Sequence, residues 1–462
     1  MRNILAPAFL LLALTAAANA QPNLPETNAG KAAALWLQIM NGGDAALIKQ
    51  YNTAYRRNLE PNEVETFRAL NGGGYRLEAI EQNEPNKIVV LLVENDTGDR
   101  VRRTFALDPT DPARAVDFGS KKLPLAQRLS RPEALSALVL RGDQLAARDY
   151  FSGGVLIAES GKILLEKTWG KSDRSTGTAI TPNTRFRMGS MNKMFTGVAA
   201  LQLVTKKKLS LDGTVGQYLP DYPNKEIAAK VTIRHLLTHS GGTGDFFGPD
   251  FDKHRLTLLK NNEDYVDFFG ARAPEFEPGS QERYSNYGMV LLGHIVQKVS
   301  GENYYTYIDR HIFAPAGMTR SGSMPESEMV AERSNGYTRN NGKWVSNADT
   351  LPWRGTAAGG GYSTLRDMLK FALALENRKL LPEELLKQAT ESQTKGNWYG
   401  FGFSIQGEGA ARWYGHGGGA PGMNGDLRVY PGLGRIVVAF SNLDPETANM
   451  MSNYYERRMP LN

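Results

Sequence analysis

The sequence predicts an α+β protein of two domains, in which segments from both ends of the second domain form one antiparallel sheet covered by helices. Three observations support this fold class. The chain has 462 residues, more than one ordinary hydrophobic core accommodates. Its first part has helical patterns followed by strand patterns, an order typical of an α+β unit. The remainder begins and ends with strand patterns and has helical patterns between them, so distant segments are expected to pair.

Residues 1–20 have the pattern of a cleaved signal peptide. Arg2 precedes the apolar residues 4–18, and residues 18–20, Ala-Asn-Ala, form a small-x-small cleavage pattern. A membrane anchor is the alternative, but the apolar run is shorter than the roughly 20 residues that span a bilayer. We therefore expect cleavage before Gln21, a periplasmic or secreted mature protein, and no integral membrane span after cleavage.

Residues 21–126 are expected to form a small α+β domain. Apolar residues recur at helical spacing over residues 31–55, with a break at the turn signal of residues 41–44. Strand patterns follow at residues 75–80, 87–93 and 101–107. This order of elements resembles the nuclear-transport-factor-like fold. The segment has no histidine, and its carboxylates have no spacing typical of a metal or acid–base site. We therefore expect a packing or protein-contact domain.

Composition narrows the chemistry and the partners. The chain has no cysteine, which excludes disulfides, a thiol nucleophile and cysteine metal ligands. The net charge of +6 is scattered along the sequence, and lysine residues 206–208 form the only basic run of three. At the end of a predicted helix, such a run is typical of a solvated face that complements the helix dipole. We therefore expect no nucleic-acid partner.

The second domain is expected at residues 127–462. It opens with a helical pattern at residues 132–147 and with two strand patterns joined by a hairpin signal, at residues 153–158 and 162–169. Helical patterns follow at residues 191–204, 231–238, 289–299 and 365–376. The closing strand patterns lie at residues 399–406, 411–416, 425–430 and 435–441, before a last helix at residues 445–457.

Ser190 and Lys193 form a Ser-x-x-Lys pattern at the start of a predicted helix. A spacing of three places both side chains on one helix face. A serine hydroxyl becomes a nucleophile when a base removes its proton, and a lysine whose pKa is lowered by burial can be that base. Free amides at the helix start can help to stabilise an oxyanion. By itself the pattern is more typical of a serine N-cap followed by a surface lysine.

Two downstream motifs strengthen the catalytic interpretation. Tyr284 and Asn286 are two residues apart in an extended segment, so both can face one pocket. A tyrosine beside the cationic Lys193 is favoured as phenolate and can act as general base, while an amphipathic core tyrosine is the alternative. The second motif is the glycine-rich segment 415–422, which contains His416.

Together with residues 231–242, these motifs resemble those of the serine β-lactamase-like superfamily. Its nearest branches are the class C β-lactamases, the D-alanyl-D-alanine peptidases and the β-lactamase-fold esterases. The resemblance covers roughly residues 149–457. It implies an antiparallel sheet flanked by helices with an all-helical lobe, and a serine hydrolase that uses no cofactor and no metal.

The resemblance also implies roles for individual residues. Ser190 would be acylated, and Lys193 and Tyr284 would exchange its proton. Asn286 would orient the substrate and Lys193. His416 would open the third motif, which continues through Gly418, and the backbone amides of Ser190 and Gly419 would form the oxyanion hole.

His235 and His239 have the i, i+4 spacing found in some zinc sites. Leu236 directly follows the first of them, so the glutamate that zincin chemistry needs is absent. We therefore expect these histidines to make structural hydrogen bonds.

The third motif bears on the substrate. In β-lactamases it is typically Lys-Thr-Gly, whereas residues 416–418 are His-Gly-Gly. A mostly neutral imidazole and a glycine bind a substrate carboxylate less well, unless Arg428 or another basic group compensates. We therefore expect a small-molecule or peptide acyl donor, an ester or a D-amino-acid peptide or amide rather than a lactam. A class C-like β-lactamase and a non-catalytic peptidoglycan- or protein-binding protein are the alternatives.

Overall fold

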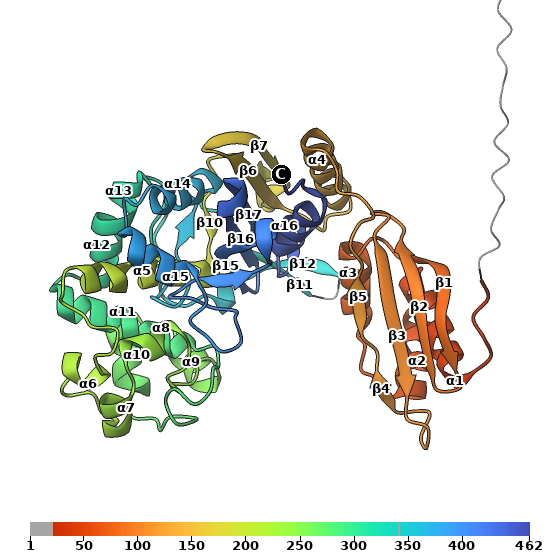
Figure 1. Ribbon diagram of the computed structural model, residues 1–462, viewed down its shortest axis with the longest axis horizontal. Coiled ribbons are helices and arrows are strands. Elements are labelled where there is room, and N and C mark those ends of the chain that lie inside the picture. Colours follow the sequence, from red (N-terminus) through yellow and green to blue (C-terminus); the bar gives the residue numbers. More distant parts are fainter. Residues whose placement is uncertain (1–21, 341) are drawn as a thin grey trace, which may run out of the picture. The chain divides into compact units, whose positions relative to one another are not determined.

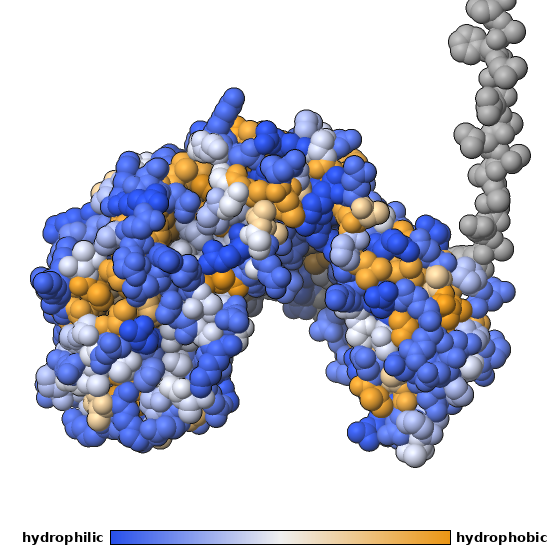
Figure 2. Space-filling model, viewed as in Figure 1, coloured by the Kyte–Doolittle hydropathy of each residue, from blue (hydrophilic) through white to orange (hydrophobic). Residues whose placement is uncertain are grey.

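The computed structural model describes residues 22–340 and 342–462 and divides the chain into two compact units, one up to Pro124 and one from Leu125 onward. The signal peptide expected at residues 1–20 lies outside the described residues. Within those two described stretches, none of the helices is long and apolar enough to cross a membrane. On the face drawn in Figure 2, hydrophilic residues predominate and apolar residues are scattered among them.

The first unit packs helices against an antiparallel sheet (Figure 1). Its elements are α1 (Asn28–Met40), α2 (Ala45–Tyr55), α3 (Pro61–Leu70), β1 (Tyr75–Glu84), β2 (Lys87–Glu94), β3 (Arg100–Leu107), β4 (Ala115–Asp117) and β5 (Ser120–Lys122). The predicted helix break is confirmed, because Asn41 ends α1 and the Asp44 side chain caps α2. The sequence prediction missed α3, which begins at Pro61, where the fixed φ of proline suits a first helical turn.

The second unit is built on a six-stranded antiparallel sheet of order β14-β15-β16-β17-β6-β7. Its strands are β6 (Gly153–Glu159), β7 (Lys162–Trp169), β14 (Ser404–Gln406), β15 (Trp413–Ala420), β16 (Met423–Tyr430) and β17 (Arg435–Ser441). Ser441 of β17 lies opposite Gly153 of β6, which confirms that distant segments form one sheet. The predicted strand at residues 399–406 is wrong in its first part, because the chain bends at Gly402, whose φ is 88°.

Helices cover both faces of this sheet (Figure 1). α4 (Arg131–Ala147) and α16 (Thr447–Arg458) pack together, and α16 also packs on β16, β17 and β6. α14 (Leu365–Glu376) packs on β17 and β6 as well, and it spans the residues predicted for it. Successive strand residues face opposite sides, and all residues of β16 and β17 are buried, so neither face of these strands is open to solvent.

The other segments form short paired strands and the all-helical lobe that the family resemblance implied. The helices are α5 (Asn192–Thr205), α6 (Val215–Tyr218), α7 (Lys225–Lys230), α8 (Ile233–Leu237), α9 (Pro249–His254), α10 (Asn262–Phe269), α11 (Asn286–Ser300), α12 (Tyr304–Ile308), α13 (Ala314–Ala316) and α15 (Glu383–Thr390). The short strands are β8 (Lys171–Asp173), β9 (Thr178–Ala179), β10 (Phe186–Arg187), β11 (Tyr337–Asn340), β12 (Lys343–Ser346) and β13 (Tyr362–Ser363). They pair as β8 with β9, β10 with β13 and β11 with β12.

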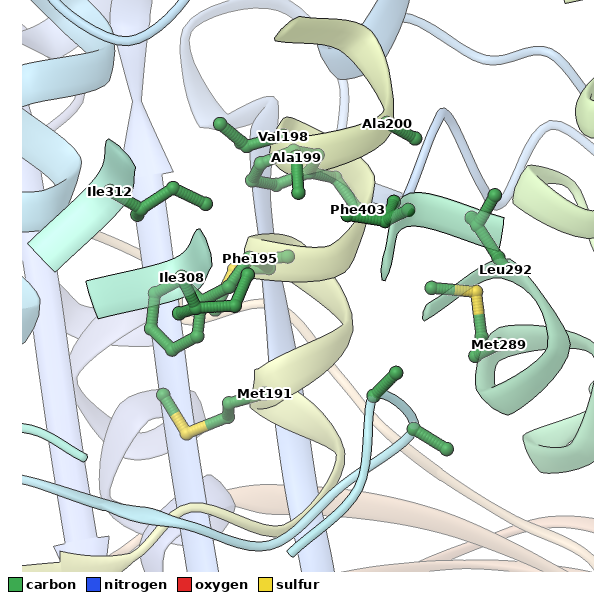
Figure 3. Packing of buried hydrophobic residues seen from close by; sticks show 14 of the residues in the cluster. Met191, Phe195, Val198, Ala199, Ala200, Met289, Leu292, Ile308, Ile312 and Phe403 are labelled. Carbon is green, nitrogen blue, oxygen red and sulfur yellow. The ribbon is translucent and has the colours of Figure 1, made fainter. Parts of the chain in front are cut away.

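The core of the second unit surrounds α5. Most residues of this helix are buried, as expected for a helix that is apolar on all sides. Figure 3 shows Ile308 and Ile312 on one side of α5, and Met289 and Leu292 on the other. This packing holds the first turn of α5, which carries Lys193, in a defined place.

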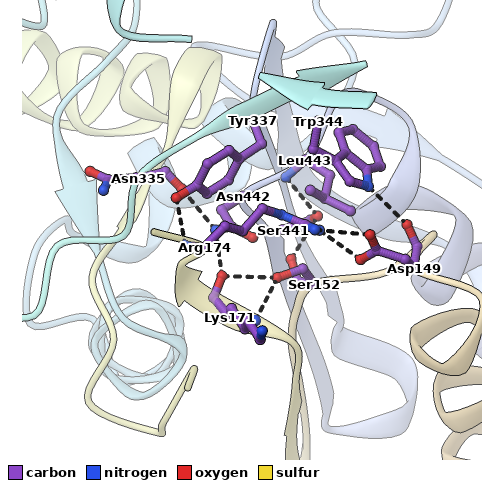
Figure 4. Close-up of polar contacts among 10 residues, drawn as sticks. All are labelled: Asp149, Ser152, Lys171, Arg174, Asn335, Tyr337, Trp344, Ser441, Asn442 and Leu443. Carbon is purple, nitrogen blue, oxygen red and sulfur yellow. Dashed lines mark hydrogen bonds and ion pairs between the residues drawn. The ribbon is translucent and has the colours of Figure 1, made fainter. Parts of the chain in front are cut away.

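A polar cluster joins the β11–β12 hairpin to the segments that flank β6 and β8 (Figure 4). The guanidinium of Arg174 forms two hydrogen bonds with the Asp149 carboxylate and lies against the rings of Tyr337 and Trp344. Trp344 also donates from Nε1 to the carbonyl of Asp149. The cluster holds the hairpin against these segments and contains none of the predicted catalytic residues.

Candidate active site

Ser190 lies in a 3₁₀ turn, η1 (Gly189–Met191), that leads directly into α5. Gly189 has a φ of 54°, in the left-handed region that favours glycine. The fully buried apolar neighbours Met188 and Met191 anchor the turn on both sides, and Ser190 itself is only half-buried. The turn therefore holds the serine at the edge of the core.

The backbone of β15 runs against this turn. A β-carbon added to Gly418 would lie 1.9 Å from the carbonyl oxygen of Met188 and 3.0 Å from the amide nitrogen of Ser190. A β-carbon added to Gly189 would lie 2.9 Å from the amide nitrogen of Gly419. Glycine is therefore required for this close approach of two backbones. The approach brings together the amides of Ser190 and Gly419, the two groups predicted for an oxyanion hole.

Lys193 lies at the centre of the site and is completely buried, with an exposed fraction of 0%. Its Nζ donates to Ser190 Oγ at 3.2 Å, to Asn286 Oδ1 at 2.7 Å and to the carbonyl of Ala358. Burial lowers the pKa of Lys193 from 10.5 to about 7, although the nearby Asp245 carboxylate acts to raise it. At neutral pH a large fraction of Lys193 is therefore uncharged and able to accept a proton from Ser190.

Tyr284 precedes α11 and completes the group around the serine. Its hydroxyl hydrogen-bonds with Ser190, and its ring centroid is 4.6 Å from Lys193 Nζ. Loss of solvent around the hydroxyl raises the pKa of Tyr284, even though 37% of the residue is exposed. The expectation of a phenolate is therefore wrong. Desolvation outweighs the hydrogen bond with Ser190, which acts to lower the pKa, and the neutral phenol is the favoured form.

Asn286 bridges the lysine to a carboxylate that the sequence prediction missed. While Asn286 Oδ1 accepts from Lys193, its Nδ2 donates to Asp245 Oδ2 at 2.7 Å. The Asp245 side chain also accepts from the amide of Phe246 at 2.7 Å, so its orientation is fixed within the loop. Asp245 thus holds the amide of Asn286 in place and acts to raise the pKa of Lys193.

His416 occupies the strand side of the site and has an exposed fraction of 5%. Its Nε2 lies 3.0 Å from the Tyr399 hydroxyl, and its ring centroid is 6.3 Å from that of Tyr284. Burial, reinforced by the charge of Lys193, lowers the pKa of His416 to about 3, so the imidazole is neutral.

Arg428 does not supply the cation that His416 lacks. It is buried and forms ion pairs with Asp426 and Glu456, and it also donates to Asn453. In the pairing of β15 with β16, Arg428 lies opposite Gly415, and His416 lies opposite Leu427, the residue before Arg428. Successive positions face opposite sides, so the side chains of Arg428 and His416 belong to opposite faces of the sheet.

The two histidines of residues 231–242 make hydrogen bonds within the protein. His235 Nδ1 accepts from the amide of Thr232 at the start of α8, and His239 Nδ1 accepts from the amide of Ser285. In residues 22–340 and 342–462, no group of three or more His, Cys, Asp or Glu side chains is arranged to hold a metal ion.

Comparisons with known proteins agree with this architecture. A family model described as beta-lactamase matches residues 142–458. A crystal structure of a penicillin binding protein from Bacillus halodurans is 31% identical, covers 67% of this chain and 98% of its own, and has a TM-score of 0.62. Penicillin-binding protein 4 of Amycolatopsis lactamdurans is 27% identical over 322 residues, which are 65% of this chain and 84% of that protein. A D-aminopeptidase of Brucella anthropi is 26% identical over 280 residues, 58% of this chain and 51% of that protein. The family model spans most of the chain and the fold agrees with the solved structure, so the chain belongs to the beta-lactamase family.

Proposed function

We propose that this protein is an exported serine hydrolase that acts through an acyl-enzyme on ester bonds or on D-amino-acid peptide or amide bonds. The observation that carries the proposal is the position of Lys193. Its amine is buried, donates to Ser190 Oγ at 3.2 Å and has a pKa lowered to about 7. A base that titrates near neutral pH within reach of a hydroxyl is what an activated serine needs. Export rests on the signal-peptide pattern of residues 1–20.

In the proposed reaction, neutral Lys193 accepts the proton of Ser190 as Oγ bonds to the substrate carbonyl carbon. The amides of Ser190 and Gly419 stabilise the resulting oxyanion. When the bond to the leaving group breaks, the proton passes from Lys193 to that group, relayed by the Tyr284 hydroxyl, which its raised pKa keeps protonated. Water then attacks the acyl carbon and gives a proton to Lys193. Lys193 returns this proton to Ser190 Oγ as the bond between Oγ and the acyl carbon breaks and the acid departs.

The charges around Lys193 support esters and D-amino-acid amides over carboxylated lactams. A neutral His416 offers no charge to a substrate carboxylate, and the ion pairs of Arg428 leave it unavailable. Asp245 instead adds a negative charge, which suits a neutral or amine-bearing acyl donor. The relative named as a D-aminopeptidase supports the same substrate class.

The nucleophile can be tested by labelling with a fluorophosphonate, followed by mass spectrometry of the labelled peptide. We expect the label on Ser190, and we expect Ser190→Ala to lose both the label and turnover while it remains folded. Ser323→Ala removes another half-buried serine and serves as the matched control. A folded wild-type protein that neither takes the label nor turns over any substrate would instead favour the binding-protein alternative.

The substrate class can be tested with three kinds of acyl donor. We expect p-nitrophenyl butyrate and D-alanine p-nitroanilide to give a higher kcat/KM than a chromogenic cephalosporin, and His416→Lys to narrow the difference. Efficient hydrolysis of the cephalosporin by the unaltered protein, with poor turnover of the other two, would establish a β-lactamase.

A further inference from the structure

His239 follows α8 and has an unusual backbone conformation. Its φ is 56°, in the left-handed region that few residues other than glycine adopt, and only 1% of the residue is exposed. Holding a non-glycine residue in this region costs free energy, so the surrounding structure has to compensate. The contacts of His239 show which groups this backbone conformation positions.

Two hydrogen bonds connect His239 to the segment that carries Tyr284. The backbone carbonyl of His239 accepts from the amide of Arg283 at 2.9 Å, and its Nδ1 accepts from the amide of Ser285 at 3.2 Å. These two donors are the residues immediately before and after Tyr284. One residue thus holds both peptide groups that flank the tyrosine.

The ring of His239 also contacts the phenol itself. The two ring centroids are 4.5 Å apart, and Tyr399 and Trp398 pack on the His239 ring at 4.6 Å and 6.0 Å. Because Nδ1 accepts a hydrogen bond, the proton of the neutral imidazole lies on Nε2, which has no hydrogen-bond partner among the described residues. Burial and the charge of Lys193 hold the pKa of His239 well below its ordinary value, so the accepting form persists.

We propose that His239 is the positioning residue for Tyr284: through the two flanking amides and the ring contact it directs the Tyr284 hydroxyl toward Ser190. The inference rests on the proposed function, in which that hydroxyl relays a proton. This role explains why a histidine occupies a position with a left-handed backbone conformation. Asparagine or glycine would adopt that conformation more readily but would lack the ring that contacts Tyr284.

His235 is a natural control for this role. It lies four residues earlier, within α8, and its Nδ1 also accepts a backbone amide hydrogen bond. That amide belongs to Thr232, so the bond caps the start of α8 instead of holding the segment that carries Tyr284.

The test is a double-mutant cycle with His239→Ala and Tyr284→Phe, read out as kcat and KM for p-nitrophenyl butyrate and as thermal unfolding. Alone, His239→Ala is expected to lower kcat about 10- to 100-fold, the scale of a displaced catalytic group, with little change in KM. In the Tyr284→Phe background, which keeps the ring and lacks the hydroxyl, the same substitution is expected to lower kcat less than about twofold. His239→Asn, which tolerates the backbone conformation and offers a shorter acceptor, is expected to recover part of the loss.

An equal loss of kcat in both backgrounds would overturn the inference, because the effect would then not depend on the Tyr284 hydroxyl. If His239→Ala fails to fold, the same cycle with His239→Asn decides by the same criterion. His235→Ala should lower the unfolding temperature without coupling to Tyr284→Phe. Failure of the proposed function is distinguishable, since the unaltered protein would then show no turnover, or its turnover would survive Ser190→Ala, whatever the cycle gives.

Discussion

Lys193 and His416 are two nitrogen bases on opposite sides of one site, and burial acts on both in the same direction. Desolvation lowers the pKa of Lys193 from 10.5 to about 7 and that of His416 from 6.5 to about 3. Because the ordinary pKa of lysine is higher, the same environment brings the pKa of Lys193 close to neutral pH and lowers that of His416 far below it. Of these two bases, only Lys193 can therefore exchange a proton near neutral pH.

Their neighbours widen this difference. The Asp245 carboxylate acts to raise the pKa of Lys193, whereas the charge of Lys193 lowers that of His416. The helix side of the site thus contains a base that can change charge, and the strand side contains a neutral hydrogen-bonding group. Burial alone does not identify a catalytic base. The ordinary pKa of the group and the sign of the nearest charge determine whether a buried group can gain or lose a proton near neutral pH.

The largest effect is expected from Lys193→Met, which keeps an apolar stem and removes the amine. We expect kcat/KM for p-nitrophenyl butyrate to fall by about 10² to 10⁴, the usual range for a lost acid–base group. Lys206→Met, at the other end of α5, is the matched control and should leave kcat/KM unchanged. If the folded Lys193 variant retained its activity, Lys193 would not be the base that exchanges a proton in this site.

A smaller effect is expected from Asp245→Asn on the dependence of kcat/KM on pH. Wild-type activity should rise with pH through about 7, as Lys193 loses its proton. Asp245 raises this pKa, so its neutralisation should move the rise to lower pH. Asp250→Asn, an exposed position in α9, should leave the profile in place. A shift to higher pH would show that Asp245 does not stabilise the ammonium form.

The smallest effect is expected from His416→Gln on the pH dependence of unfolding. The folded pKa of His416 is about 3 and its ordinary value is 6.5, so between these values the unfolded chain binds a proton that the folded chain does not. This group therefore contributes stability that is present above pH 6.5 and is lost as the pH falls toward 3. Denaturant unfolding of the glutamine variant should depend less on pH in this window than wild type or His254→Gln. An unchanged slope would contradict a neutral, buried His416.

The sequence predicted the parts of the site that belong to motifs. The contacts of Lys193 with Ser190 and Asn286 follow from helical spacing and from the family resemblance, and the structure brings these residues together. Asp245 escaped prediction because it acts on Lys193 through Asn286, which is distant in sequence, and no local sequence pattern indicates such a contact. For His239 the sequence predicted a structural hydrogen bond, which is confirmed, but not its partner Ser285.

The errors in the sequence prediction have physical causes. A phenolate at Tyr284 was wrong because the motif shows only that Lys193 is near, whereas the desolvation that raises the pKa of Tyr284 depends on the packed fold. The strand expected from residue 399 was too long because strand propensity does not register a bend at Gly402. The helix at residues 365–376 was predicted correctly, because its amphipathic period is long and uninterrupted.

The pairing of β6 with β17 has a consequence for the order in which the chain folds. Ser152 and Ser441, which share a hydrogen bond at one end of these strands, are 289 residues apart. A sheet closed by so long a loop forms slowly, because the entropy of closure is lost before the contacts are gained. The first unit, whose strands pair over short loops, can form while later residues are still being synthesised. A chain that ended before Arg435 would leave the edges of β6 and β16 unpaired, so incomplete chains are expected to aggregate rather than to retain partial activity.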